Sequence, residues 1–132
     1  MKMYIAGQWV DRDNTMFVLN PFDQSIIDTV PKGSSGDVEL AINSAARGAA
    51  VMGKMPAYER YTILRRTADL MAERSEDLAK TITNEEGKVI AEGRSEVQRA
   101  IQTITLSSEE AKRLHGETVP LDGAPGITSQ FG

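Results

Sequence analysis

The sequence contains no cysteine among its 132 residues. Disulfide bonds, thiolate zinc sites and cysteine nucleophiles are therefore excluded within this chain. Aromatic residues are also scarce, with three phenylalanines, three tyrosines and one tryptophan. Aromatic side chains bury the largest apolar areas in protein cores, so a core built from this chain must rely on smaller side chains.

Basic residues are not in excess. The 15 lysines and arginines are outnumbered by 19 aspartates and glutamates, which gives a formal net charge of -4. This balance argues against a nucleic-acid-binding protein, which usually carries a basic patch. No stretch approaches the roughly 20 apolar residues of a membrane span, and Gln8 and Asp11 interrupt the N-terminus before an apolar run of secretory length. We therefore expect a cytoplasmic protein that binds neither nucleic acid nor membranes.

The first region, residues 1–36, has the pattern of short strands and turns. Tyr4–Val10 is divided by a turn glycine at Gly7, and Thr15–Leu19 is a β-branched and aromatic run. Ser25–Val30 is a further short strand, followed by a proline and a glycine-rich loop. Hairpins this small need another element to pack on.

The second region, residues 37–115, has helical periodicity. Its first helix is expected to be capped by Ser35 or Asp37, and its apolar positions form one face at helical spacing: Val38, Ala41, Ile42, Ala45, Ala46 and Ala49.

Three more apolar stripes follow in the same region. One begins after Pro56, which suits a first-turn position, and a shorter one ends near Gly87, where a left-handed C-terminal residue is favourable. The last stripe carries a long helix to Gly116. These faces are rich in alanine, which buries little area per residue, so we expect the helices to cover another layer rather than to form a core of their own.

The third region, residues 116–132, is rich in glycine and proline and is expected to be an extended connection. Ile127–Phe131 has the composition of a strand that begins just before the last residue. We therefore expect a partial domain that belongs to a longer protein.

Six short motifs occur in one order between residues 4 and 122. Together they resemble the N-terminal part of the aldehyde dehydrogenase superfamily. The chain departs from the family pattern at Val51-Met52-Gly53, where a tryptophan is usual, and at Val89, where proline is common. The motifs are Tyr4–Trp9, Asn20–Pro31, Asp37-Val38 with its alanine-rich helix, Pro56–Leu64, Glu85–Val97 and Glu109–Asp122.

The resemblance implies an α/β parent fold, the aldehyde dehydrogenase fold with its Rossmann-like cofactor domain. This segment would be mainly α-helical with short N-terminal β-hairpins. Residues 1–36 would supply the strands and turns, residues 37–115 a helical layer of the cofactor-binding domain, and residues 116–132 the opening of the oligomerisation arm. The implied partners are the remainder of the chain or its subunits in a homo-oligomer.

The resemblance also implies a chemistry. The parent would oxidise a small aldehyde, such as lactaldehyde or glyceraldehyde 3-phosphate, to its carboxylic acid with NAD or NADP. A cysteine thiolate would form a thiohemiacetal, hydride would pass to the nicotinamide, and a glutamate would activate water. None of the residues that do this is in the chain. We therefore predict no catalytic and no cofactor-binding residue here, and no turnover or cofactor binding by this segment alone.

One binding site is implied within the segment. Some family members hold a structural monovalent cation near the start of the chain, and the positions that match its ligands are the backbone carbonyls of Val18 and Leu19 and the carboxylate of Glu85. Oxygen ligands suit a hard cation. The plainer interpretation of Glu85-Glu86-Gly87 is the end of a helix with glycine as its cap.

The remaining candidates have plainer explanations. The loop Gly33–Gly36 precedes a helix and is able to hold a phosphate, but its spacing fits no phosphate-binding motif, which favours a plain turn. His115 has no nucleophile beside it and is interpreted as an exposed or capping residue. Two other functions stay open: a non-catalytic helical oligomerisation or interaction module derived from such an enzyme, and acid–base catalysis by Glu85 or Glu86.

Overall fold

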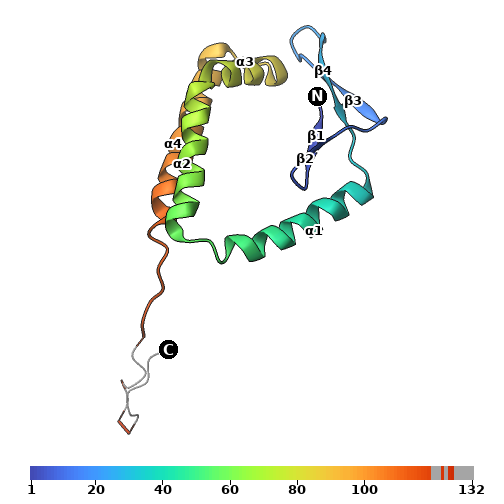
Figure 1. Cartoon of the computed structure of the whole chain (residues 1–132). Coiled ribbons are helices and arrows are strands. Elements are labelled where there is room, and N and C mark those ends of the chain that lie inside the picture. Colours follow the sequence, from blue (N-terminus) through green and yellow to red (C-terminus); the bar gives the residue numbers. More distant parts are fainter. Residues whose placement is uncertain (120–122, 124, 127–132) are drawn as a thin grey trace.

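The computed structural model describes residues 1–119, 123 and 125–126. Four short strands are followed by four helices, and these elements form an open frame (Figure 1). The first helix runs along one side of the frame from the strands to the base of a helical pair. The third helix projects from the top of that pair back toward the strands (Figure 1).

The strands form two separate antiparallel hairpins. In the first, β1 (Met3–Ile5) pairs with β2 (Gln8–Val10) across a turn in which Ala6 and Gly7 have φ values of 52° and 83°. Two consecutive positive φ values are typical of a type I′ hairpin turn, which explains the predicted turn at Gly7. In the second, β3 (Thr15–Leu19) pairs with β4 (Ile26–Pro31).

The first helix, α1 (Ser35–Met52), begins two residues before the predicted start of the helical region at residue 37. Its N-cap is Ser34, so the predicted cap at Ser35 or Asp37 is wrong. Asp37 instead occupies the third helical position and completes a capping box. The Ser34 hydroxyl accepts from the backbone N–H of Asp37, and the Asp37 carboxylate accepts from that of Ser34.

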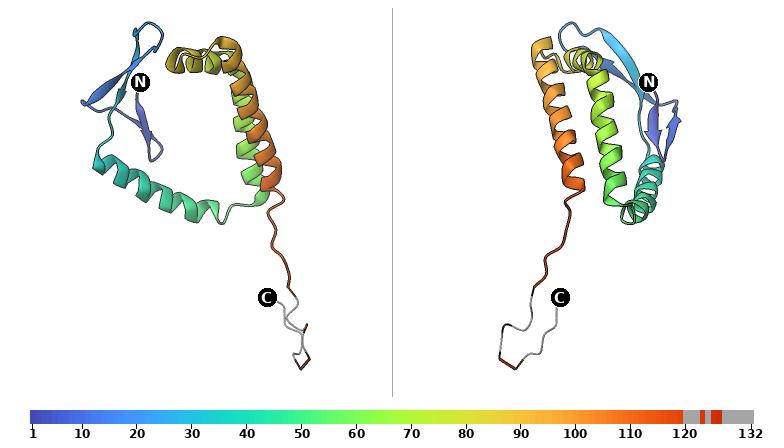
Figure 2. Two further views of the ribbon diagram at one scale, coloured as in Figure 1. Left: turned by 180° about the vertical axis from the view of Figure 1, so that it is seen from behind. Right: turned by 60° about the vertical axis from the view of Figure 1, so that its left-hand side comes forward.

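The other three helices pack together. α2 (Ala57–Glu73) and α4 (Ile90–Ala111) lie antiparallel side by side, and α3 (Ser75–Glu86) packs against the start of α4 (Figure 2). Pro56 occupies the N-cap of α2, and Gly87 ends α3 with φ 75°, the left-handed cap that the sequence predicted.

The predicted extension of the last helix to Gly116 is wrong. α4 ends at Ala111, and residues 114–119 continue without regular structure. Leu114, the last residue of the predicted stripe, is 76% exposed. It adds no buried area that would hold another helical turn in place. Most of the predicted connection at 116–132, including Ile127–Phe131, lies outside the described residues.

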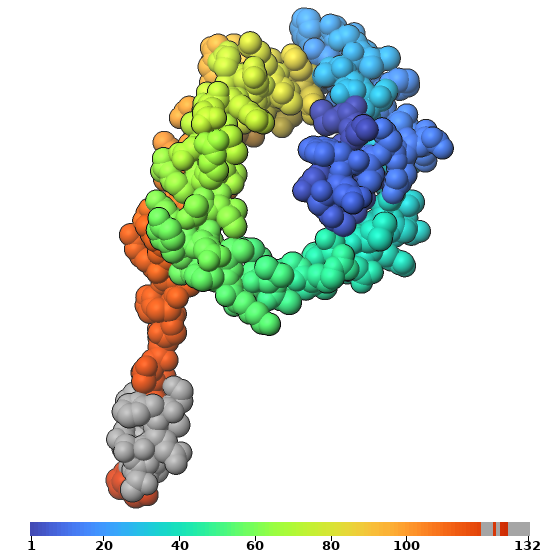
Figure 3. Space-filling view, viewed as in Figure 1, coloured from blue at the N-terminus to red at the C-terminus, as the bar shows by residue number. Residues whose placement is uncertain are grey.

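The core of the described part is small and lies between the last three helices. Its buried hydrophobic residues are Ala68, Ala79, Val97 and Ala111. None is larger than valine, so the alanine-rich stripes bring the helices close together but bury little area each. The space-filling view shows an opening through the frame, bounded by α1, α2 and the hairpins (Figure 3). The fold therefore presents faces rather than a closed interior.

Candidate functional site

The described part of the chain holds no group of three or more histidine, cysteine, aspartate or glutamate side chains that could bind a metal ion. None of its helices is long and apolar enough to cross a membrane. His115 is exposed beyond the end of α4 and places its Nδ1 against the backbone carbonyl of Arg113, so it faces no nucleophile within the described residues.

Glu86, at the end of α3, forms an ion pair. Lys88 Nζ lies 2.7 Å from Glu86 Oε2 and 2.6 Å from Glu96 Oε2. Hydrogen bonds to Glu86 and Glu96 raise the pKa of Lys88 above its ordinary value, and the bond from Lys88 lowers the pKa of Glu96. The Glu86 carboxylate is thus engaged by Lys88, which argues against catalysis by Glu86.

The residues of the candidate cation site lie on two elements, β3 and α3. Val18 and Leu19 are consecutive on β3 and pair with Asp28 and Ile26 of β4, so the extra residue at this irregularity is Ile27 of β4. Glu85 lies in the last turn of α3 and is exposed.

One glycine and one proline show how closely the end of α3 approaches the turn between β3 and β4. A Cβ atom placed on Gly87 would lie 2.8 Å from Cγ of Pro21, which follows β3 by two residues. The end of α3 therefore packs directly against the turn between β3 and β4, and glycine is required there both by its positive φ and by this contact. Glu85 precedes Gly87 by two residues and Leu19 precedes Pro21 by two, so the candidate ligands lie near this contact, and the cation site stays a prediction.

The predicted plain turn at Gly33–Gly36 is wrong in its second half, because Ser35 and Gly36 are the first two residues of α1. The backbone N–H and hydroxyl of Ser34 both donate to Asp37 Oδ2, at 2.9 and 2.8 Å. Asp37 also places a carboxylate at the helix N-terminus, where it would repel a phosphate. These contacts argue against phosphate binding here.

Arg12 was not predicted to matter, although it completes this cluster. Its guanidinium forms two hydrogen bonds to Asp37, from Nε to Oδ2 at 3.3 Å and from Nη2 to Oδ1. Asp37 is only 4% exposed. The hydrogen bonds from Arg12, followed by those from the backbone and side chain of Ser34, hold the pKa of Asp37 well below its ordinary value. Arg12 thereby fixes the connection between the hairpins against the start of α1.

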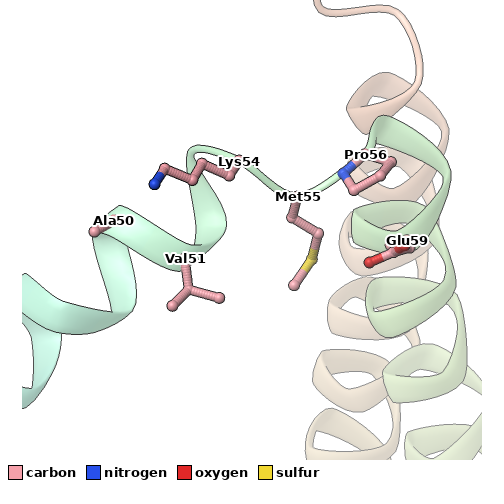
Figure 4. Close-up of a pocket in the computed structure, with 6 residues that line it drawn as sticks. All are labelled: Ala50, Val51, Lys54, Met55, Pro56 and Glu59. Carbon is pink, nitrogen blue, oxygen red and sulfur yellow. The ribbon is translucent and has the colours of Figure 1, made fainter.

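A shallow pocket lies in the angle between α1 and α2 (Figure 4). Val51 and Met55 point into this angle, whereas Lys54 points away along α1 (Figure 4). The pocket combines a mostly apolar lining with one carboxylate and one ammonium group, and no hydroxyl or thiol side chain lines it. Its lining residues are Ala50, Val51, Lys54, Met55, Pro56 and Glu59.

Comparison with known proteins identifies the fold to which these elements belong. The model of the aldehyde dehydrogenase family matches residues 9–131. The chain is 40% identical over 129 residues to 3-sulfolactaldehyde dehydrogenase from Priestia aryabhattai, which covers 98% of this chain and 27% of that protein. The chain spans about a quarter of the length of the curated relatives it matches.

Solved structures give the same result. An aldehyde dehydrogenase from Physcomitrella patens, in complex with the reaction product succinate, matches with a TM-score of 0.90 and 34% identity over 94% of this chain and 26% of its own. An NAD-dependent benzaldehyde dehydrogenase from Corynebacterium glutamicum matches with a TM-score of 0.86 and 30% identity over 95% of this chain and 28% of its own. The predicted fold class, a mainly helical segment of this fold with short hairpins at its N-terminus, is confirmed. The chain belongs to the aldehyde dehydrogenase family.

Proposed function

We propose that this chain is the scaffold portion of an NAD- or NADP-dependent aldehyde dehydrogenase that oxidises a small aldehyde to its carboxylic acid. The observation that carries the proposal is the family match over residues 9–131 in a chain without cysteine. The sulfur nucleophile that the family resemblance implies would come from the remainder of the enzyme. The role of residues 1–132 is then to support the cofactor-binding domain and not to bind substrate or cofactor.

The helices and the connection after them would have different structural roles. Residues 37–115, which contain the four helices apart from the first two residues of α1, would form a layer of the cofactor-binding domain, and residues 116–132 would open the arm through which subunits associate in a homo-oligomer. The alanine-rich helices and the open frame support the first assignment, because they suit elements that cover another layer. A cytoplasmic location completes the proposal, and cell fractionation would test it.

The experiment that tests the function is a hybrid enzyme. Residues 1–132 replace the matched quarter of the Priestia 3-sulfolactaldehyde dehydrogenase, and the purified hybrid is assayed for reduction of NAD or NADP with 3-sulfolactaldehyde. We expect turnover that is lost when the cysteine nucleophile of the Priestia portion is replaced by alanine. A folded, oligomeric hybrid without activity would contradict the proposal. A module retained only for interaction would give that result.

The candidate cation site predicts that the melting temperature depends on which monovalent cation is present. In the hybrid enzyme, potassium or sodium at constant ionic strength is expected to raise the melting temperature above that in a bulky organic cation. Glu85→Ala should remove most of this rise, because the carboxylate is the one charged ligand proposed for the site. The measurement is thermal unfolding in each salt. Glu92→Ala, which removes another exposed glutamate on α4, is the matched control and should leave the rise intact. An equal rise in both variants would exclude Glu85 as a ligand.

A further inference from the structure

The frame closes where the turn between β3 and β4 meets the end of α3 (Figure 3). A Cβ atom placed on Gly87 would lie 2.8, 3.7 and 4.0 Å from Cγ, Cβ and Cδ of Pro21, so the proline ring lies directly over the glycine. Gly87 has no side chain and a positive φ, which together leave room for the ring. Both residues remain exposed, so this contact closes the frame while burying little area.

Hydrogen bonds within the turn hold Pro21 in place. The backbone N–H of Asn20 donates to the carbonyl of Ser25 at 2.9 Å, and that of Gln24 donates to the carbonyl of Asn20 at 2.8 Å. The Gln24 side chain donates to the carbonyl of Pro21 itself, and the Asp23 carboxylate accepts from the backbone and hydroxyl of Ser25. The turn is therefore ordered by its own bonds, independently of α3.

The end of α3 is held by a different set of contacts. Lys88 follows Gly87 directly, and its ammonium group lies between Glu86 of α3 and Glu96 of α4, at 2.7 and 2.6 Å. These ion pairs fix the end of α3 against α4 on either side of the glycine. Both partners of the contact are thus positioned before they meet.

The β3–β4 hairpin is attached to the helices at its other end by a short connection. Residues 32–34 lead from β4 into α1 without regular structure, and they include Gly33. The start of α1 is itself fixed through Asp37. Met16 and Phe17 on β3 are 54% and 63% exposed, so these side chains add little to the attachment of the hairpin. A glycine-containing connection next to a fixed helix start has the features of a hinge.

We propose that the contact of Pro21 with Gly87 is a latch, and that the β3–β4 hairpin swings on residues 32–34 when the latch opens. The ring holds the frame closed through a few methylene contacts, whereas the start of α1 is held by the buried, charged pair of Arg12 and Asp37. The latch is therefore the weaker attachment, because charge-assisted bonds at a buried site are stronger than a small exposed apolar contact. Opening would separate the hairpin from α3 and leave the helical pair and α1 in place.

A distance measurement in the 132-residue chain tests the latch. The chain contains no cysteine, so two introduced thiols can be spin-labelled specifically. Thr15→Cys on β3 and Lys80→Cys on α3 are both at exposed positions, and pulsed electron paramagnetic resonance gives the distribution of distances between the labels. We expect one main distance. Pro21→Ala should add a longer one and raise the ratio of open to closed frames roughly three- to tenfold, because it removes two methylene groups that contact the glycine.

Gly87→Asn tests the latch from the other partner. Asparagine tolerates the left-handed conformation, so it can still end α3, but its side chain meets the ring of Pro21. It should add the same longer distance. Combined with Pro21→Ala it should add less than it does alone, because the ring that it displaces is already missing.

Phe22→Ala is the matched control. Phe22 is the next residue of the same turn, and its side chain is 91% exposed. The substitution removes a larger side chain than Pro21→Ala does and should leave the distance distribution unchanged. Far-ultraviolet circular dichroism of each labelled variant checks that the helices remain formed.

Three outcomes would overturn the inference. The same distribution with and without Pro21→Ala and Gly87→Asn would show that the contact does not hold the frame closed. A longer distance that already dominates without either substitution would show that the frame is open in solution. An equal change from Phe22→Ala would assign the effect to the turn as a whole rather than to the ring of Pro21.

Discussion

Gly93→Ala is expected to destabilise the chain by about 2 kcal/mol, although alanine is the better helix former. Gly93 is buried in α4 where that helix crosses α3. A Cβ atom at this position would lie 2.8 Å from the carbonyl oxygen of Ala79 and 3.2 Å from Oγ1 of Thr83. The nearer neighbour is backbone, so the two helices must move apart, and the small core between them loses contact. The measurement is chemical unfolding of the isolated chain followed by far-ultraviolet circular dichroism.

Gly48→Ala is the control, and it is expected to change the free energy of unfolding in the opposite direction. Gly48 lies in the middle of α1, and a Cβ atom there would have no neighbour within 4 Å. Both substitutions restrict the unfolded chain equally, so the difference between them reports the folded state. We expect Gly48→Ala to stabilise the chain by about 0.5–1 kcal/mol. A stabilising effect at both positions would show that α3 and α4 do not approach as described.

Asp37→Asn is expected to lower the melting temperature by roughly 5–10 °C, the largest effect of any single charge change in the chain. The carboxylate is 4% exposed and accepts hydrogen bonds from Arg12 and from both the backbone and the hydroxyl of Ser34. Asparagine has no charge to pair with the guanidinium, so Arg12 loses its partner and the hairpins lose their attachment to α1. The measurement is thermal unfolding at neutral pH.

Asp37 also predicts how the stability of the folded chain changes at acid pH. Because the pKa of Asp37 is depressed in the folded state, its contribution to stability is fully present above the ordinary aspartate value of 3.8 and is lost as the pH falls below it. The stability of the wild-type chain should therefore fall more steeply below about pH 4 than that of Asp37→Asn.

Asp77→Asn provides the comparison for this prediction. Asp77 is exposed and occupies the third position of α3, as Asp37 does in α1. Both changes remove a favourable charge from the first turn of a helix, which is worth about 0.3–1 kcal/mol at exposed sites. Only Asp37 has Arg12 against it. Equal effects of the two substitutions, at neutral or acid pH, would show that the pairing with Arg12 contributes nothing.

The helices could be predicted from sequence because their apolar periodicity is regular. The glycine cap at Gly87 and the turn at Gly7 could be predicted for a local reason, since each requires a positive φ that glycine adopts freely. The end of the last helix was not predictable in this way. Leu114 continues the periodic pattern, but no described residue buries it, and an apolar residue without a partner does not hold a helical turn.

The long-range contacts were not accessible to sequence reasoning. Arg12 and Asp37 are separated by 25 positions, and nothing in the pattern of either residue indicates the other. Glycine inside a helix usually weakens it, and the requirement for glycine at position 93 is visible only once Ala79 lies across from it. The candidate cation ligands came from family resemblance alone, because backbone carbonyls such as those of Val18 and Leu19 leave no signature in side-chain identity.

We propose that these residues support an aldehyde oxidation which they do not themselves perform. The direct measurement is the reduction of NAD and NADP by the purified 132-residue chain with a panel of small aldehydes, 3-sulfolactaldehyde included. We expect no turnover above a blank without protein, because no nucleophilic thiol is present to attack the aldehyde. Turnover by the isolated chain that a substitution within it, such as Glu85→Gln or Glu86→Gln, abolishes would contradict the account.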